Sequence, residues 1–177
     1  FGFSDTNTAG MMAVISGLFL IFAIVFSPKQ GFLTKFINQL RINLKITKED
    51  ILGLLYRFEK MELKDTTNIT PKLLQQAKGT GPFLFNLSIK KLLKEQKIEK
   101  KGLFYKLTEN GFYEASNLLR SHRLWESYIQ KHLTTPDDHL HFAAHQLEHI
   151  TDKEMQKKLN ERSGNPKSNP HGKKIPN

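Results

Sequence analysis

The feature that most restricts the fold of this chain is an uncharged, almost wholly apolar run over residues 9–26. A helix that spans a membrane needs roughly 17–25 mainly apolar residues, so this run is long enough to cross a bilayer. Gly10 and Gly17 fit a membrane helix, because Gly is more frequent there than in soluble helices. A signal peptide carries its cations before the apolar run, whereas here only Asp5 precedes it and the cations follow. We therefore predict a membrane-spanning helix, with a buried core helix as the alternative.

The segment after the apolar run is basic and amphipathic. Between Lys29 and Lys48 it carries five cations and no acidic residue, so the positive-inside rule predicts that this side of the span faces the cytoplasm. Its apolar residues fall on one helical face, which indicates a helix on an anionic lipid surface or against a partner, or a plain linker helix. That face consists of Leu33, Phe36, Ile37, Leu40 and Leu44.

Composition narrows the partners and the chemistry. The formal net charge is +10, which implies an anionic partner, either nucleic acid or lipid headgroups. The chain has no Cys, so disulfides and thiolate metal sites are excluded, and a bound metal must use nitrogen and oxygen ligands. Because the chain begins with Phe1 rather than Met, we expect it to be the C-terminal part of a longer protein or a processed product.

The next part of the sequence has the pattern of a winged helix-turn-helix. We predict a helix with Thr47 as its N-cap, a short helix that starts at Thr70-Pro71 and stops at Gly79, and a third helix opened by Pro82. Residues 97–107 then predict two short strands about a Lys-Gly turn. Three helices followed by a hairpin is the winged-helix order, in which the third helix is offered to the DNA major groove.

The C-terminal part is predicted to be helical. Thr108 caps a long helix that runs to about His132, and Thr135 to Asp138 start the next one. Thr151 to Glu154 form a capping box for a last short helix, and loop or extended chain is expected from Ser163 onward. The fold class is therefore mainly α. Four segments are predicted: the transmembrane helix (1–28), the basic linker (29–46), the winged helix-turn-helix (47–108) and a helical domain with an extended tail (109–177).

A cluster of His and Glu in this helical domain is difficult to explain as packing. His122 and Glu126 are four residues apart on one helix, so their side chains point the same way. The next helix carries one polar stripe of His141, His145, Glu148 and His149. The opposite face is the predicted core stripe of Leu140, Ala143, Ala144, Leu147 and Ile150. Imidazole with carboxylate suits divalent Mn, Fe, Co, Ni or Zn, whereas the alternative is a solvated polar face.

An enzyme is not favoured by these residues. Glu148 directly precedes His149, so the HExxH signature of zincin proteases is not formed, and no candidate base or nucleophile lies beside the cluster in sequence. His132 and His139 fall off the stripe, and we interpret them as ordinary surface residues.

With these residues placed, the sequence resembles the DtxR/MntR family of metal-dependent transcriptional repressors over about residues 47–177. The matching elements are Ser121-His122-Arg123-Leu124-Trp125-Glu126, His141, Leu147-Glu148-His149 and the tail from Asn169 to Pro176. The resemblance implies a homodimer through the C-terminal helical domain. It also implies a divalent metal corepressor, with Mn or Fe favoured and Zn as an alternative.

The resemblance also implies two metal sites. The first takes Asp50, His145, Glu148 and His149, and the second takes His122, Glu126 and His141. His145 stands where the family usually has Cys or Glu, so the metal preference of the family cannot be transferred. Asp50 has a simpler alternative role as an acid in the first turn of its helix.

The opening segment resembles a different protein class. Phe26 to Gly31 looks like the end of the last membrane helix of an ABC-type manganese, zinc or iron permease. This likeness implies a membrane location, ABC transporter subunits as partners and a cytoplasmic soluble part.

DNA binding is the expected output of the repressor family, but the helix from Pro82 departs from it. Phe83, Leu84 and Phe85 stand near its start, and they cannot hydrogen-bond to bases. Later cations could hold phosphates. The candidate DNA contacts are Asn86, Ser88, Lys90, Lys91, Lys94, Lys100 and Lys101. Two outputs therefore stay open: metal-gated binding of operator DNA, or a winged helix that no longer reads DNA and regulates the permease from the cytoplasmic side.

Overall fold

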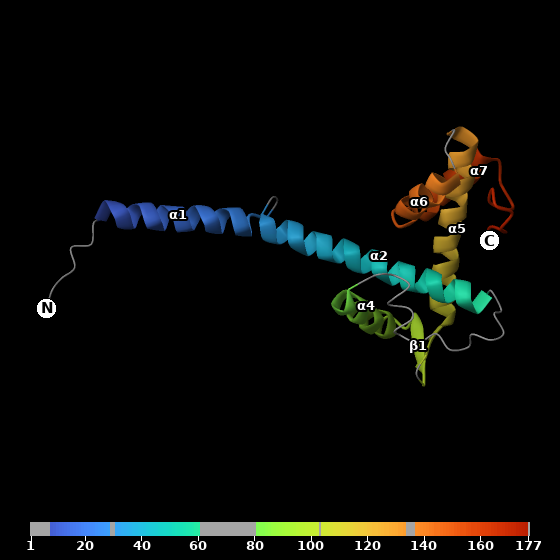
Figure 1. Cartoon of the computed structure of the whole chain (residues 1–177), viewed down its shortest axis with the longest axis horizontal. Helices are drawn as coiled ribbons and strands as arrows, with labels where there is room; N and C mark the ends of the chain where they lie inside the picture. The colour runs from blue at the N-terminus through green and yellow to red at the C-terminus, as the bar shows by residue number, and fades with distance from the viewer. Residues whose placement is uncertain (1–7, 29–30, 61–80, 103, 134–136, 177) are drawn as a thin grey trace. The chain divides into compact units, whose positions relative to one another are not determined.

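The fold is described from a computed structural model of the chain, which describes all residues except 1–7, 29–30, 61–80, 103, 134–136 and 177 (Figure 1). The described elements form two compact units, Phe1–Asn43 and Leu44–Asn177. The elements are α1 (Thr8–Phe26), α2 (Phe32–Lys60), α4 (Pro82–Lys94), β1 (Ile98–Lys101), β2 (Phe104–Leu107), α5 (Glu109–His132), α6 (Asp137–Glu148) and α7 (Lys153–Ser163). The mainly helical class is as predicted, and the finer division into four segments stays a prediction.

The first unit contains the predicted apolar helix. Helix α1 covers Thr8–Phe26, within one residue of the predicted run, and none of its residues is buried. Among the described residues it is the one helix that is long and apolar enough to cross a membrane. The connection to α2 is tied by a hydrogen bond of 3.1 Å from the Thr34 hydroxyl to the Ser27 carbonyl oxygen.

The predicted start of a new helix at Thr47 is wrong. Helix α2 runs without interruption from Phe32 to Lys60, and Thr47 is a buried residue within it. An N-cap requires non-helical backbone at the capping residue. Residues 33–46 contain neither Gly nor Pro, so nothing local interrupts the helix that arrives there.

The winged-helix elements of the second unit share one hydrophobic core. Pro82 occupies the first turn of α4, and the hairpin pairs Ile98 with Leu107 and Lys101 with Phe104, as predicted. Gly102 has φ of +64° in the turn, a conformation that favours Gly. The core residues come from α2, α4, β1 and α5: Ile51, Leu52, Leu55, Tyr56, Phe85, Ile89, Leu92, Ile98 and Ala115. The short helix predicted from Thr70-Pro71 lies outside the described residues.

The start of α5 is held against the hairpin. As predicted, Thr108 is the N-cap, and its hydroxyl accepts a hydrogen bond of 3.1 Å from the Gly111 amide. A Cβ atom at Gly111 would lie 1.8 Å from the Lys97 carbonyl oxygen. Only Gly permits this approach, which fixes the long helix that carries His122 relative to the winged-helix core.

The C-terminal helices pack around α5, with α6 and α7 both against it (Figure 1). Leu124, Leu159 and Ile175 form the centre of this second core. The tail from Asn165 is irregular, as predicted, and has one isolated bridge between Ser168 and Lys174. Helix α6 is described from Asp137, whereas Thr135 and Pro136 lie outside the described residues.

Two local predictions in this region are wrong. The N-cap of α7 is Asp152, whose carboxylate accepts from the Met155 amide, rather than Thr151. The Thr151 hydroxyl instead donates to the Leu147 carbonyl and accepts from the Trp125 indole. The sequence predicts Ile150 on the core stripe, but its side chain is 75% exposed, because α6 ends at Glu148 and the helical periodicity does not extend to it.

Candidate metal centre

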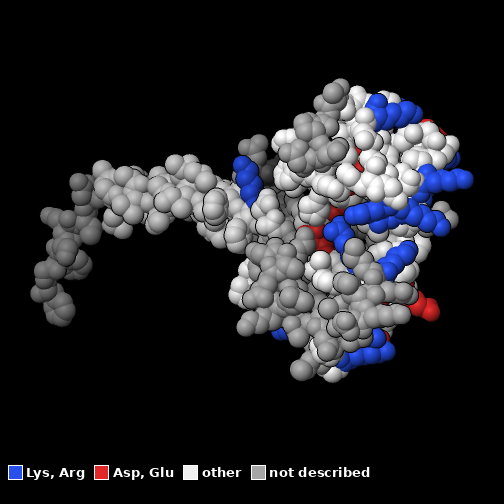
Figure 2. All heavy atoms as spheres, turned by 45° about the vertical axis from the view of Figure 1, so that its right-hand side comes forward, with Lys and Arg blue, Asp and Glu red and all other residues white. Residues whose placement is uncertain are grey.

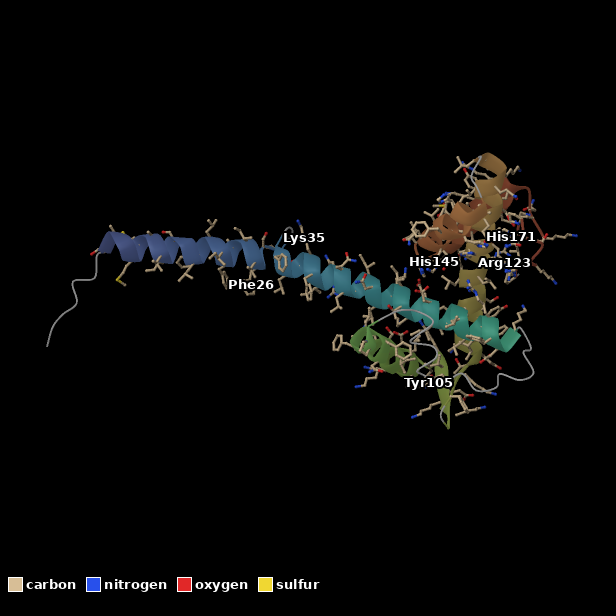
Figure 3. All side chains as sticks on the ribbon, in the orientation of Figure 1. Phe26, Lys35, Tyr105, Arg123, His145 and His171 are labelled. Atoms are coloured by element: carbon tan, nitrogen blue, oxygen red, sulfur yellow. The ribbon has the colours of Figure 1, made fainter. Side chains whose placement is uncertain are left out.

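All seven predicted metal ligands lie in the second unit, and the structure brings them into two groups. Asp50 comes from α2, His122 and Glu126 from α5, and the remaining four from α6 and the residue after it. The α2–α6 cluster consists of Asp50, His145, Glu148 and His149, and the α5–α6 cluster consists of His122, Glu126 and His141. In each cluster one ligand atom per residue lies within 4.8 Å of the others. Figure 3 labels His145 on α6 and Arg123 on α5.

The α2–α6 cluster is built around the Nε2 atom of His149. This atom is buried and has no hydrogen-bond partner among the described residues. It lies 3.6 Å from Asp50 Oδ1 and 3.7 Å from Glu148 Oε1. Two atoms that bind one ion at about 2.1 Å in tetrahedral geometry are about 3.4 Å apart, close to these spacings. A buried imidazole nitrogen beside two carboxylate oxygens can hold either a proton or a metal ion, and this set of nitrogen and oxygen donors fits a divalent metal.

The α5–α6 cluster is centred on Glu126, which is fully buried. Its Oε1 atom lies 3.1 Å from His122 Nε2 and 2.5 Å from His141 Nδ1. The other oxygen, Oε2, accepts a hydrogen bond of 2.5 Å from the Asn169 side-chain amide. His141 is half exposed, so this cluster has one open side.

Glu148 connects the two clusters. Its Oε1 atom lies 2.7 Å from His145 Nδ1, and its Oε2 atom lies 2.7 Å from His122 Nδ1. Both ring nitrogens of His122 therefore face carboxylates, one from each cluster. The seven side chains form one network rather than two separate sites.

The pKa values of this network follow from burial and from these contacts. Burial disfavours the charged imidazolium of His122, but hydrogen bonds to Glu126 and Glu148 outweigh it and raise the pKa to about 9. Burial likewise disfavours the two carboxylates. For Glu126, hydrogen bonds from His122 and Asn169 outweigh burial and lower the pKa to about 2. For Glu148, hydrogen bonds from His122 and His145 do the same and lower its pKa to about 2. In the metal-free chain at neutral pH, a protonated His122 lies between two carboxylates.

We expect the metal-free chain to be most stable between about pH 4.5 and 6.5. The pKa of His122 is raised in the folded state, so its contribution is complete below about 6.5 and is lost as the pH rises through about 9. The pKa values of Glu126 and Glu148 are lowered, so their contribution is complete above about 4.5 and is lost as the pH falls through about 2. The alkaline loss should be on the order of 3 kcal/mol.

Thermal unfolding of the full chain in detergent with a chelator, between pH 4 and 10, measures the alkaline limb of this profile. The variant His122→Gln should flatten the alkaline limb, whereas His132→Ala, which changes an exposed His, should retain it. An alkaline limb that is equally steep in His122→Gln would contradict the assignment to His122.

A cavity of about 670 Å³ opens onto both clusters. Its walls combine the acidic and imidazole ligands with the cations Arg57, Lys60, Arg123 and Lys173. Figure 2 shows Lys and Arg side chains spread over the visible face of this unit, with acidic side chains between them. The cavity gives small ions a route to the buried ligands.

Two residues of the network were not predicted from the sequence. Glu49 Oε2 lies 2.7 Å from His149 Nδ1, and Asn169 holds Glu126 as described above. Asn169 is part of the tail motif, which could have indicated a role. Glu49 gave one usable signal, because it directly precedes Asp50 and acids often support metal-binding imidazoles.

One of the predicted DNA contacts, Ser88, is contradicted by the structure. Ser88 is fully buried, and its hydroxyl donates to the Leu84 carbonyl at 2.8 Å, so its prediction as a DNA contact is wrong. It lies on the face of α4 that packs in the core with Phe85 and Leu92. The other candidates are exposed and stay predictions: Asn86, Lys90, Lys91, Lys94, Lys100 and Lys101.

Comparison with known proteins agrees with this geometry. Residues 108–177 match the family described as iron dependent repressor, metal binding and dimerisation domain. Two curated relatives are each named a probable metal transport system membrane protein. The one from Chlamydia trachomatis is 23% identical over 96% of this chain and 38% of its own length. The one from Chlamydia pneumoniae is 28% identical over 79% of this chain and 32% of its own length. The chain thus spans about a third of these relatives.

Solved structures show the same fold for most of the chain. The manganese regulator SloR is 31% identical with a TM-score of 0.65, and ScaR with bound Zn²⁺ is 34% identical with a TM-score of 0.63. Each match covers 73% of this chain and 59% of the other. The solved neighbours named as regulators or repressors are not enzymes, and several are named for manganese or bound metal. Residues 108–177 are therefore similar to the metal-binding and dimerisation domain of iron-dependent repressors, and the chain shares its fold with the manganese regulator SloR.

Proposed function

We propose that this chain is a divalent-metal-sensing module that regulates metal uptake by metal-dependent DNA binding and is attached to the C-terminal end of an ABC-type metal permease. The observation that carries the sensing role is the convergence of seven nitrogen- and oxygen-bearing side chains into two clusters. Mn²⁺ or Fe²⁺ is the favoured ion, and Zn²⁺ is the alternative, because imidazole and carboxylate accept all three.

Attachment to a permease is supported by the apolar helix and by the relatives. Helix α1 has the length and composition of a membrane span, and both curated relatives are named as membrane proteins of metal transport. The cations between Lys29 and Lys48 support a cytoplasmic position for the metal clusters. The partners would then be the other subunits of the transporter.

A homodimer through the helical domain is part of the proposal. The matched family is described as a dimerisation domain. Phe142, Leu133 and Ile150 are 68%, 57% and 75% exposed, and apolar side chains of this size support a subunit contact.

DNA binding is supported by exposed polar and basic side chains on α4 and β1. Asn86 is suited to contact a base edge, and the lysines at 90, 91 and 94 are suited to contact phosphates. One observation favours the alternative output, in which metal binding regulates transport directly. Phe83, in the first turn of α4, is 73% exposed at the position where a base-reading helix needs hydrogen-bonding groups.

A mobility-shift titration distinguishes these outputs. The full chain in detergent is mixed with labelled duplex from upstream of its own transporter genes, excess nonspecific DNA and either Mn²⁺ or a chelator. We expect Mn²⁺ to tighten binding at least about tenfold, and added salt to weaken it steeply because phosphate contacts release counterions.

The substitution of Lys90, Lys91 and Lys94 together by Ala should remove the shift. The matched control replaces Lys153, Lys157 and Lys158, exposed cations of α7, and should retain it. A wild-type chain that gives no metal-dependent shift at moderate salt would overturn the DNA-binding output and favour direct control of transport.

A further inference from the structure

We infer that Glu49 is a positioning residue for the α2–α6 cluster: it fixes His149 in the tautomer and orientation that direct Nε2 toward Asp50 and Glu148. The inference rests on the proposed metal site and adds to it a residue that does not itself bind the ion. In this arrangement His149 Nδ1 is bonded to Glu49, and Nε2 is left for the ion.

The contact between the two residues is direct and mostly buried. His149 Nδ1 lies 2.7 Å from Glu49 Oε2, and the two side chains are 6% and 17% exposed. A carboxylate has only acceptor oxygens, so the proton of the hydrogen bond belongs to Nδ1. In a neutral imidazole the lone pair must then be on Nε2, which is the atom a metal requires.

The buried His149 side chain borders a cavity. A second cavity of about 150 Å³ is lined by His149, Glu49 and residues of α5, including Leu118 and Ser121. The hydrogen bond to Glu49 is therefore a specific contact that fixes the ring on the side next to this cavity.

Lys45 holds both partners from the same helix. Its ammonium group donates to the His149 backbone carbonyl at 2.7 Å and lies 3.7 Å from Glu49 Oε1. Glu49 and Lys45 are one turn apart on α2, so a single helical face contacts both the ring and the main chain of His149. Asp50, the next residue on α2, supplies an oxygen to the cluster itself.

The arrangement is that of a carboxylate, an imidazole and a metal in series. Such partners orient the ring and increase the basicity of the bound nitrogen, and their loss typically reduces metal affinity about 10- to 100-fold. We expect Glu49→Ala to cause a loss of this size. Glu49→Gln retains an acceptor oxygen without the charge, so it should restore most of the affinity, to within about tenfold of the wild type.

The experiment titrates the full chain in detergent with Mn²⁺ by calorimetry and with Co²⁺ by visible absorption. Both series are repeated with His141→Ala present throughout, so that the α2–α6 cluster is measured without the other. Glu154→Ala is the matched control, because it removes the same charge from a side chain that is 75% exposed. It should bind both ions as the wild type does.

The outcomes separate the inference from the function on which it rests. A wild-type chain that binds neither ion would overturn the proposed metal site itself. A wild-type chain that binds while Glu49→Ala binds equally tightly would overturn the positioning role. Cobalt bands that change in position in Glu49→Ala would overturn it too, since they would show that a ligand had been lost. Weaker binding with unchanged bands, restored by Gln, would support it, and helical circular dichroism confirms that each variant is folded.

Discussion

A chain in which Glu148 and His149 are both replaced by Ala should unfold at the same temperature with and without Mn²⁺. In the wild type, an ion present at about 100 times its dissociation constant stabilises the folded state by about 2.7 kcal/mol, because it binds the folded chain and not the unfolded one. The double variant removes two ligands of the α2–α6 cluster. It also removes the carboxylate that faces His122 in the other cluster. The stabilisation should therefore be abolished rather than halved.

The matched control is the double variant His132→Ala with Glu154→Ala. It removes the same two residue types from exposed positions outside both clusters. Its metal-induced shift in melting temperature should equal that of the wild type. If the Glu148/His149 variant retained the full shift, the clusters would not be the metal site.

The apparent affinity of the α5–α6 cluster for metal should increase about tenfold for each unit by which the pH rises, up to about pH 9. The pKa of His122 is raised to about 9 by its two carboxylate partners, so this ligand carries a proton at neutral pH. An ion must displace that proton, and the apparent affinity falls as the proton concentration rises. Between pH 6.5 and 8.5 the expected gain is about 100-fold.

Calorimetric titration in two buffers of different ionisation enthalpy measures the protons released. We expect about one proton per ion at the α5–α6 cluster near pH 7, where His122 is protonated. The same protein at about pH 10 is its own control, because His122 is then largely deprotonated and the release should vanish. If no protons were released at pH 7, the metal would not displace the proton of His122.

Much of the fold and of the site could be predicted from local patterns. The limits of α1 followed from an uninterrupted apolar run, and the hairpin followed from its Lys-Gly turn. The pairing of His122 with Glu126 followed from helical spacing, which places residues four apart on one face. These features depend on neighbours in sequence.

The remaining features depend on residues that are distant in sequence. Glu49 and His149 are separated by 100 positions, and no spacing rule relates them. The buried state of Ser88 depends on which face of α4 packs inward, and the exposed state of Ile150 depends on where α6 ends. Thr47 is a strong capping residue, but the residues before it are helical in the structure. The local preference was outweighed by continuation of that helix.

The two oxygens of Glu148 have a consequence for how sharply the chain can respond to metal. An ion held by one cluster changes the charge that this carboxylate presents to the other, and thermodynamic reciprocity makes the effect equal in both directions. An ion near Oε1 offsets part of the negative charge that keeps His122 protonated, which makes the second set of ligands easier to fill. We expect occupancy to rise over a narrower range of ion concentration than a single isolated site allows. One shared side chain would thereby give the sensor a threshold.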